Sequence, residues 1–136
     1  MDCPFCQLVD EVVLIENDLC IAIQTRDPVL LGSAMLFPRA HRATPFDITA
    51  DEWAATRELL LALRDQIDRD HRPDGYNIGW NVGAVGGQEV EHAHLHLHPA
   101  VRRRAAGRSR HPPRLQAALE RPSENVTAAC AVGNSP

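Results

Sequence analysis

The sequence contains no lysine, few aromatic residues and no long apolar segment. Arginine supplies all 14 of the residues counted as lysine or arginine, and because arginine codons are GC-rich, a GC-rich gene explains the bias. Aromatic residues make up 4% of the chain, so we expect a mostly aliphatic core. No apolar run approaches the roughly 20 residues that a membrane span needs, and the start lacks the basic and apolar regions of a signal peptide. These absences predict a cytoplasmic protein that has no membrane partner.

The net charge of -4 is unevenly distributed along the chain. Residues 1–100 hold 7 arginines against 16 acidic residues, whereas residues 101–136 hold 7 arginines against 2 acidic residues. The acidic first part argues against a nucleic-acid partner. The whole chain is 44% hydrophobic, and its length suits a single folded domain without disulfides. The second part is rich in Arg, Ala, Pro and Ser without periodicity, so we assign it to a disordered tail.

Aliphatic and alternating runs predict five β-strands. They lie at residues 12–16, 19–24, 34–37, 76–82 and 90–97. Asn17-Asp18 separates the first two, which is typical of a hairpin. The short connections favour an antiparallel sheet.

One long helix is expected between the third and fourth strands. Thr49 and Glu52 have the spacing of a capping box. Apolar residues then recur at intervals of 7, 3 and 4, which places them on one helical face: Trp53, Leu60, Leu63 and Ile67. Pro73 and Gly75 end the helix. Strands followed by a helix and further strands indicate an α+β domain, in which the helix packs on one face of the sheet.

Histidine occupies every second position near the end of the predicted domain. The residues are His92, His94, His96 and His98, and they alternate with Ala93, Leu95 and Leu97. On a strand these imidazoles would share one face, about 7 Å apart along the chain. A neutral imidazole can attack phosphorus covalently and can also transfer protons near neutral pH. The alternative is a nonspecific metal-binding tract.

The pair Cys3-Pro4-Phe5-Cys6 has three interpretations: a redox site, two ligands of a zinc site, or two free thiols. The sequence is similar to the redox site of glutaredoxins. However, such a site follows a strand within a βαβ unit, and that pattern is missing here. Cys20 lies in a predicted strand and is expected to be a small buried apolar residue.

The segment Gly87 to Leu97 resembles the signature of the histidine triad family of nucleotide hydrolases and transferases: His-x-His-x-His with apolar x, preceded by Gly-Gln-x-Val. Further similarities stand in the same order upstream, at Pro28, Gly32, residues 36–41, residues 47–52, Asn81 and Gly83. The resemblance covers about residues 3–99. It implies an antiparallel sheet of about five strands with one long helix and a short N-terminal helix, a domain at residues 1–100, and a homodimer.

The resemblance assigns roles to the three triad histidines. His94 would attack the α-phosphate of a nucleotide and form a nucleotidyl-histidine intermediate. His96 would bind the phosphate, and His92 would orient His94 or bind metal.

The resemblance also implies two sets of binding residues. Nucleotide-binding positions are Asn81, Gly87, Gln88 and Glu89, with Phe5, Leu8 and Ile23 lining the base pocket or, alternatively, belonging to the core. Similarity to family members with an N-terminal cysteine pair implies structural zinc at Cys3, Cys6, His41 and His92.

Three positions depart from the family pattern. Ser33 replaces the loop histidine, Thr25 replaces an acid that binds ribose in many members, and Glu89 stands where Ser or Thr is frequent. A carboxylate at position 89 would repel a polyphosphate unless it is protonated or faces away.

The implied function is hydrolysis at the α-phosphate of nucleoside phosphoramidates or dinucleoside polyphosphates. A nucleotidyl transferase or phosphorylase differs from a hydrolase only in the acceptor. An alternative of another class is a nucleotide-binding interaction module with little turnover. Replacing His94 by Ala discriminates these, since binding should survive and turnover should not.

The residues after the triad lack the Pro-Arg-Tyr and glycine-containing segment of the family. One GC-rich back-translation of residues 100–113, read one base later, encodes Arg-Tyr-Ala-Asp-Glu-Pro-Leu-Ala-Gly, which is similar to that segment. We hypothesise that the reading frame slips near His98 and that residues 101–136 are out of frame; the alternative is a genuine disordered tail. Sequencing the gene tests this hypothesis.

Overall fold

The computed structural model describes residues 2–8, 10–25 and 31–102. Within these residues the elements are α1 (Pro4–Gln7), β1 (Val13–Glu16), β2 (Cys20–Gln24), β3 (Ala34–Pro38), a 3-10 turn (Pro45–Asp47), α2 (Ala50–His71), β4 (Gly75–Trp80) and β5 (Leu95–Ala100). Pro28 and the predicted tail from residue 103 onward lie outside the described residues. Residues 101 and 102 follow β5, where the backbone N–H of Arg102 donates to Asp74 Oδ2 at 2.7 Å.

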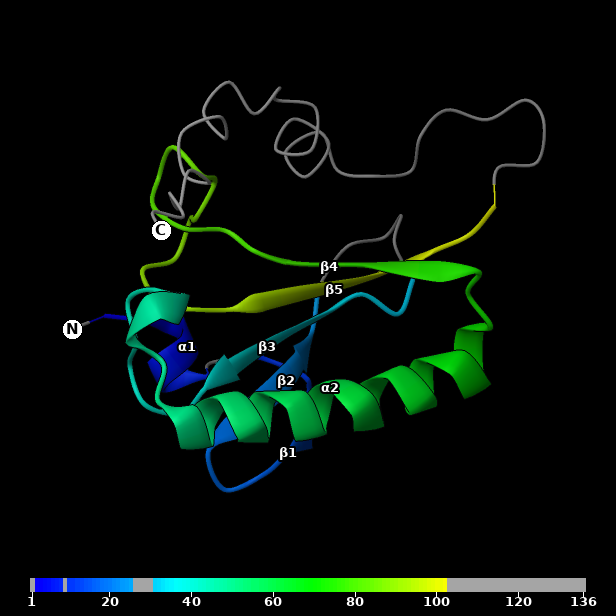
Figure 1. Ribbon diagram of the computed structural model, residues 1–136, viewed down its shortest axis with the longest axis horizontal. Coiled ribbons are helices and arrows are strands. Elements are labelled where there is room, and N and C mark those ends of the chain that lie inside the picture. The colour runs from blue at the N-terminus through cyan, green and yellow to red at the C-terminus, as the bar shows by residue number, and fades with distance from the viewer. Residues whose placement is uncertain (1, 9, 26–30, 103–136) are drawn as a thin grey trace, which may run out of the picture.

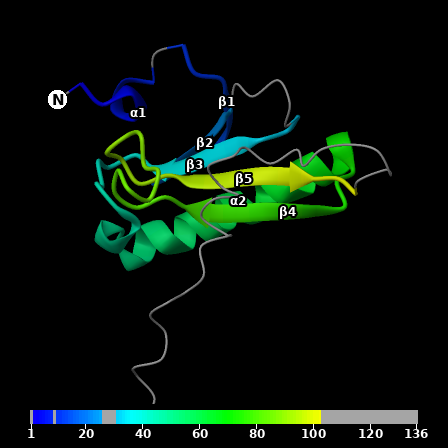
Figure 2. The ribbon, with the colours of Figure 1, turned by 90° about the horizontal axis from the view of Figure 1, so that it is seen from above.

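The five strands form one antiparallel sheet in the order β1-β2-β3-β5-β4. The long helix α2 runs along one face of this sheet (Figure 1), and α1 lies near the end where the loops before β5 gather (Figure 2). The α+β architecture with a five-stranded sheet, one long helix and one short helix confirms the predicted fold class.

The β1–β2 hairpin turns at Asn17-Asp18, as the sequence predicts. Asn17 Oδ1 accepts hydrogen bonds from the backbone N–H groups of Leu19 and Cys20, at 3.2 and 2.8 Å. The Asn17 amide also donates to Ala55 O at 3.0 Å. A single side chain therefore closes the turn and fastens it to α2.

The predicted capping box begins α2. Thr49 Oγ1 accepts from the N–H of Glu52 at 3.2 Å, and the Glu52 carboxylate accepts from the N–H of Thr49 at 2.9 Å. The helix ends at His71, before Arg72 in the left-handed backbone conformation (φ 45°). The face that packs on the sheet holds Ala55, Leu59, Leu63 and Ile67.

Trp53 was predicted on the same helical face as Leu63 and Ile67, but in the structure it is not buried with them. Its side chain remains 44% exposed, and it makes an edge contact with Trp80 of β4, with ring centroids 5.4 Å apart. The helical spacing grouped Trp53 with the core residues, but its indole instead packs against Trp80 of the edge strand β4.

The two faces of the sheet belong to different clusters. The face under α2 is aliphatic and includes Ala22, Leu36, Leu95 and Leu97. On the opposite face, Ile21, Ile23 and Phe37 of the sheet pack in one cluster with Phe5 of α1. Cys20 is fully buried on the α2 side, as expected for a small apolar residue.

The last strand starts later than predicted. It covers Leu95–Ala100 rather than residues 90–97, and β4 ends at Trp80 rather than at residue 82. His92 and His94 therefore precede β5, and only His96 and His98 lie within it. The rings are also closer than the predicted spacing of about 7 Å, with centroids 4.8 Å apart for His94 and His96 and 5.6 Å for His96 and His98.

Candidate functional site

The candidate site lies on the sheet face opposite α2, which we call the histidine face. Met35 and Gly79 are the strand partners of His96, and directly opposed residues of antiparallel strands project to the same side. Leu95 and Leu97 alternate with His96 and pack in the α2 core. The apolar neighbours thus anchor β5 while His96 projects to the other side.

His92 is completely buried and has a defined tautomer. Its Nε2 lies 2.8 Å from Pro38 O, and a carbonyl can only accept, so Nε2 carries the proton in the neutral ring. Burial is the main reason why the pKa of His92 lies below its usual value. The unprotonated Nδ1 faces two sulfur atoms, at 3.4 Å from Cys3 Sγ and 3.6 Å from Cys6 Sγ.

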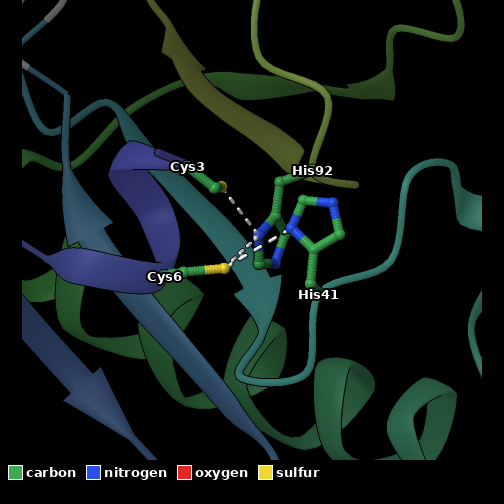
Figure 3. A group of neighbouring side chains, drawn as sticks. All are labelled: Cys3, Cys6, His41 and His92. Carbon is green, nitrogen blue, oxygen red and sulfur yellow. Dashed lines mark hydrogen bonds between the residues drawn. The ribbon is translucent and has the colours of Figure 1, made fainter. Parts of the chain in front are cut away.

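His41 completes a cluster of four potential metal ligands. Its Nδ1 lies 3.4 Å from Cys6 Sγ, and one ligand atom from each of Cys3, Cys6, His41 and His92 lies within 4.8 Å of the others. Figure 3 shows both cysteines extending from the N-terminal turn toward the two imidazoles. The four predicted metal residues therefore come together in a group that could hold a metal ion.

His94, the predicted nucleophile, is 5% exposed and lies between His92 and His96 along the chain. Its Nδ1 lies 2.7 Å from the carbonyl oxygen of His92, so Nδ1 donates and Nε2 holds the lone pair when the ring is neutral. Burial lowers the pKa of His94, which favours that neutral form. Phe5 contacts the ring edge-on, with centroids 5.1 Å apart.

His96, the predicted phosphate-binding residue, contacts His94 edge-on. Burial, with smaller contributions from His94 and His98, lowers the pKa of His96 to about 4. Its Nε2 is buried and has no hydrogen-bond partner among the residues that the structure describes. A buried polar atom without a partner is costly, so this nitrogen is a candidate contact for a ligand.

The predicted nucleotide-binding loop is held by the side chains of Gln88 and Asn81. Gln88 Nε2 donates to Ala43 O at 2.7 Å and to Val90 O at 3.0 Å, and its Oε1 accepts from the N–H of Gly83 at 2.8 Å. Asn81 Nδ2 donates to Gly87 O at 3.3 Å. Both amides therefore hydrogen-bond to backbone atoms of the loop, and Gln88 also ties the loop to Ala43, which follows β3.

Two glycines are needed for the loop conformation. Gly87 has φ +89°, which side-chain-bearing residues rarely adopt. A Cβ at Gly86 would collide with Val82 O. Glu89, beyond this turn, is exposed and has interactions of its own.

The three predicted base-pocket residues lie at the apolar end of the histidine face. Phe5 stacks on Phe37, with centroids 4.6 Å apart and an angle of 12° between the rings. Ile23 is completely buried, and Leu8 packs against the same cluster while remaining partly buried. Ile23 thus has no exposed surface here, whereas Leu8 lies at the margin of the cluster.

The sequence analysis missed Arg42, which links α2 to the histidine segment. Its guanidinium binds both oxygens of the buried Glu52 carboxylate, at 3.0 to 3.2 Å, and its carbonyl accepts from Ala93 N at 2.6 Å. Ala93 stands between His92 and His94, so the start of α2 is connected to the residues that precede β5. Glu52 was predicted as a helix cap, but nothing in the local pattern identified Arg42 as its partner.

Comparison with known proteins identifies the family. The family model of the HIT domain matches residues 7–103, and the chain belongs to this histidine triad family. A relative from Schizosaccharomyces pombe, named adenosine 5'-monophosphoramidase hnt1, is 31% identical over 103 residues, which cover 73% of this chain and 74% of that protein.

Two further comparisons support this assignment. The adenylylsulfatase HINT3 of Arabidopsis thaliana is 27% identical over 106 residues, 75% of this chain but only 54% of that relative's length. The crystal structure of a HIT family member from Bacillus subtilis matches with a TM-score of 0.71 at 22% identity, covering 86% of this chain and 92% of that one. This likeness agrees with the fold.

The described residues contain no helix that is both long and apolar enough to cross a membrane.

Proposed function

We propose that this protein is a nucleotide hydrolase that cleaves at the α-phosphorus through a nucleotidyl-histidine intermediate on His94. The observation that carries the proposal is the hydrogen bond of 2.7 Å from His94 Nδ1 to the carbonyl oxygen of His92. It leaves the Nε2 lone pair of a neutral imidazole for attack on phosphorus.

The proposed reaction has two displacements. His94 Nε2 donates its electron pair to the α-phosphorus, the bond from phosphorus to the leaving group breaks, and the leaving group takes a proton. Water then attacks the same phosphorus and loses one proton to the solvent, which replaces the proton taken up by the leaving group. The P–N bond breaks, the nucleoside monophosphate is released, and His94 returns to its neutral form. His96 Nε2 is the proposed donor to a phosphate oxygen, and the backbone at Gly87 is a further proposed contact.

Nucleoside phosphoramidates are the proposed first substrate class. The activity named for the Schizosaccharomyces pombe relative and the chemistry of the site both support this choice. Dinucleoside polyphosphates, the second class, would place further negative charge near the exposed Glu89. Transfer to another acceptor, or phosphorolysis, would use the same first displacement.

The test compares wild type with His94→Ala on a panel of adenosine phosphoramidate and diadenosine polyphosphates. We expect turnover to fall by about 10⁶-fold in the variant, as for removal of a serine nucleophile, with nucleotide binding retained. His71→Ala, which removes an exposed histidine at the end of α2, is the matched control and should keep activity. Nucleotide binding by an inactive wild type would instead support the interaction module.

We also propose that Cys3, Cys6, His41 and His92 bind structural zinc. In a tetrahedral site with Zn–S of about 2.3 Å and Zn–N of about 2.0 Å, the sulfur and nitrogen ligands lie about 3.5 Å apart. The three S–N distances here are 3.4, 3.4 and 3.6 Å. The Nε2–H of His92 donates to Pro38 O, which is how metal-bound histidines are usually oriented.

Metal analysis of the purified protein tests this assignment. We expect one zinc ion per chain in wild type, and less than one tenth of that in a Cys3→Ser, Cys6→Ser double variant. Cys20→Ser is the control, because Cys20 is buried on the other face of the sheet. A wild type without zinc after expression in zinc-supplemented medium would contradict the proposal.

A homodimer and a cytoplasmic location are further parts of this proposal. β4 is an edge strand, and Ile78 in its middle is 53% exposed, which leaves apolar surface for a second copy. The three described cysteines are free thiols, as suits a reducing compartment. Sedimentation equilibrium tests the dimer, and a concentration-independent monomer would contradict it.

A further inference from the structure

A row of polar residues crosses the histidine face one step beyond His96. The row comprises Thr25, Ser33, His98 and Asn77, from β2 across to β4. The N–H of Thr25 donates to Ser33 O at 3.0 Å, and Asn77 is the strand partner of His98. Thr25 follows Ile23 by two residues, and Ser33 precedes Met35 by two. Ile23 and Met35 are strand partners on the histidine face. Because side chains two residues apart project to the same side of a strand, Thr25 and Ser33 also project to this face.

The centre of this row is a buried hydrogen-bonded pair. Ser33 is 1% exposed and His98 is 5% exposed, and Ser33 Oγ lies 3.0 Å from His98 Nδ1. A hydroxyl and an imidazole are costly to bury unless they are hydrogen-bonded. Each partner therefore satisfies a polar atom of the other, and the bond fixes the orientation of the His98 ring.

The fixed ring of His98 packs on His96. Their centroids are 5.6 Å apart with an angle of 20° between the planes, a stacked arrangement. On its other side His96 meets His94 edge-on at 4.8 Å. Ser33, His98, His96 and His94 thus form a continuous series of contacts that ends at the proposed nucleophile.

The ring of His96 is supported by packing at its buried end. No described residue hydrogen-bonds to its Nε2, and the His94 and His98 rings contact it. The pKa of about 4 makes His96 neutral at pH 7. A neutral imidazole has one N–H group and one lone pair, and only the tautomer with a proton on Nε2 can donate from that atom to a phosphate oxygen.

We propose that Ser33 and His98 form a positioning pair that sets the ring orientation of His96. A fixed orientation gives each ring nitrogen one environment, and through that environment it selects one tautomer. The contact that transmits this effect is the stacking of the His98 ring on the His96 ring. The inference rests on the proposed function, in which His96 binds the phosphate.

The test uses three variants of the full chain. Ser33→Ala removes the hydroxyl and retains the His98 ring. His98→Asn keeps a polar group near the position of Nδ1 but removes the stacked ring. Thr56→Val is the matched control, because Thr56 is also a buried hydroxyl residue, bonded to Glu52 O at 2.8 Å, but lies on α2.

The first measurement is the tautomer ratio of His96 in the protein without substrate, from the ¹⁵N chemical shifts of its ring nitrogens. Signals are assigned by comparison with a His96→Gln protein. We expect one dominant tautomer in wild type and in Thr56→Val, and a mixture in Ser33→Ala and His98→Asn. Identical ratios in all four proteins would overturn the inference, whether or not the protein is an active hydrolase.

The second measurement is the kinetics with adenosine phosphoramidate. Ser33→Ala and His98→Asn should lower kcat by about tenfold while KM changes by less than about twofold, since a misplaced group mainly affects the transition state. Wild-type kcat in both variants, even with altered tautomers, would also overturn the inference. An inactive wild type would refute the proposed function, and the tautomer ratios would then decide the inference by themselves.

Discussion

The two faces of the sheet carry different types of side chain and differ in their expected roles. The face under α2 is aliphatic, with Leu59, Leu63, Leu95 and Leu97 closely packed. The histidine face collects imidazoles, thiols and hydroxyls, and most of their hydrogen bonds run to backbone carbonyls or to one another. Stability should therefore depend mainly on the face under α2, and chemistry on the histidine face. The exception is the proposed zinc site, where the histidine face would also contribute to stability.

The largest expected effect tests that exception. If zinc binds the folded chain and is present at about 1,000 times its dissociation constant, removing it should lower the free energy of unfolding by about 4 kcal/mol. Denaturant unfolding with and without a chelator measures this change. The Cys3→Ser, Cys6→Ser double variant is the control, and its free energy of unfolding should not respond to the chelator. If the chelator leaves the free energy of unfolding of wild type unchanged, metal binding adds no stability.

A core substitution on the other face should separate stability from chemistry. Leu63→Ala leaves a cavity under the sheet, because Leu63 is 1% exposed, and should cost about 3 kcal/mol of unfolding free energy. At a temperature where the variant is folded, kcat should equal that of wild type. A tenfold loss of kcat would indicate that packing under α2 controls the imidazoles, and the comparison of the two faces would fail.

Arg42 connects α2, through Glu52, to the histidine segment, through Ala93. Its replacement should lower the free energy of unfolding by an intermediate amount. Arg42→Met leaves the buried Glu52 carboxylate without its cationic partner, which we expect to cost about 2 kcal/mol, since Arg42 is partly exposed to water. Because Arg42 also accepts from Ala93 through its backbone, this carbonyl bond should survive. Thermal unfolding measures the loss, and a variant as stable as wild type would contradict it.

The same ion pair predicts a pH dependence. Hydrogen bonds from Arg42 hold the pKa of Glu52 below its usual value of 4.5. A depressed carboxyl pKa contributes stability above the unfolded-state pKa, and this stability is lost as the pH falls through the folded-state value. Unfolding measured from pH 6 down to pH 3 should therefore show a shallower acid decline in Glu52→Gln than in wild type; parallel curves would argue against this role.

The smallest expected effect concerns the start of α2. Thr49→Ala removes a side-chain cap and should lower the unfolding free energy by about 1 kcal/mol without affecting turnover. Thr49→Ser keeps the hydroxyl and serves as the control. Equal stability of the alanine and serine variants would mean that the cap bond from Glu52 N adds nothing measurable.

The sequence predicted the periodic parts of the fold and missed its non-local bonds. The hairpin at Asn17-Asp18 and the capping box at Thr49 depend on neighbouring residues, so local patterns revealed them. The start of β5 was predicted too early because the alternation of histidines begins in the irregular segment before Leu95. Trp53 fitted the helical spacing, but its contact with Trp80 joins distant residues.

In the candidate site too, the sequence motifs predicted some residues and missed the bonds between distant ones. The resemblance to family members with an N-terminal cysteine pair predicted a site formed by four residues: Cys3, Cys6, His41 and His92. The structure places one ligand atom of each within 4.8 Å of the others. No motif predicted the role of Arg42 or the pairing of Ser33 with His98. Arg42 reaches Glu52 across the turn that leads into α2, which no periodic pattern marks. Ser33 and His98 are far apart in the sequence, and the register of β3 with β5 brings them into contact.

The stereochemistry at phosphorus tests the central claim most directly. A substrate with a chiral, sulfur-substituted α-phosphorus is hydrolysed in ¹⁸O water, and the configuration of the product is determined. Two successive in-line displacements, first by His94 and then by water, predict retention of configuration. Inversion would mean that water attacks the phosphorus directly, and would contradict a nucleotidyl-histidine intermediate.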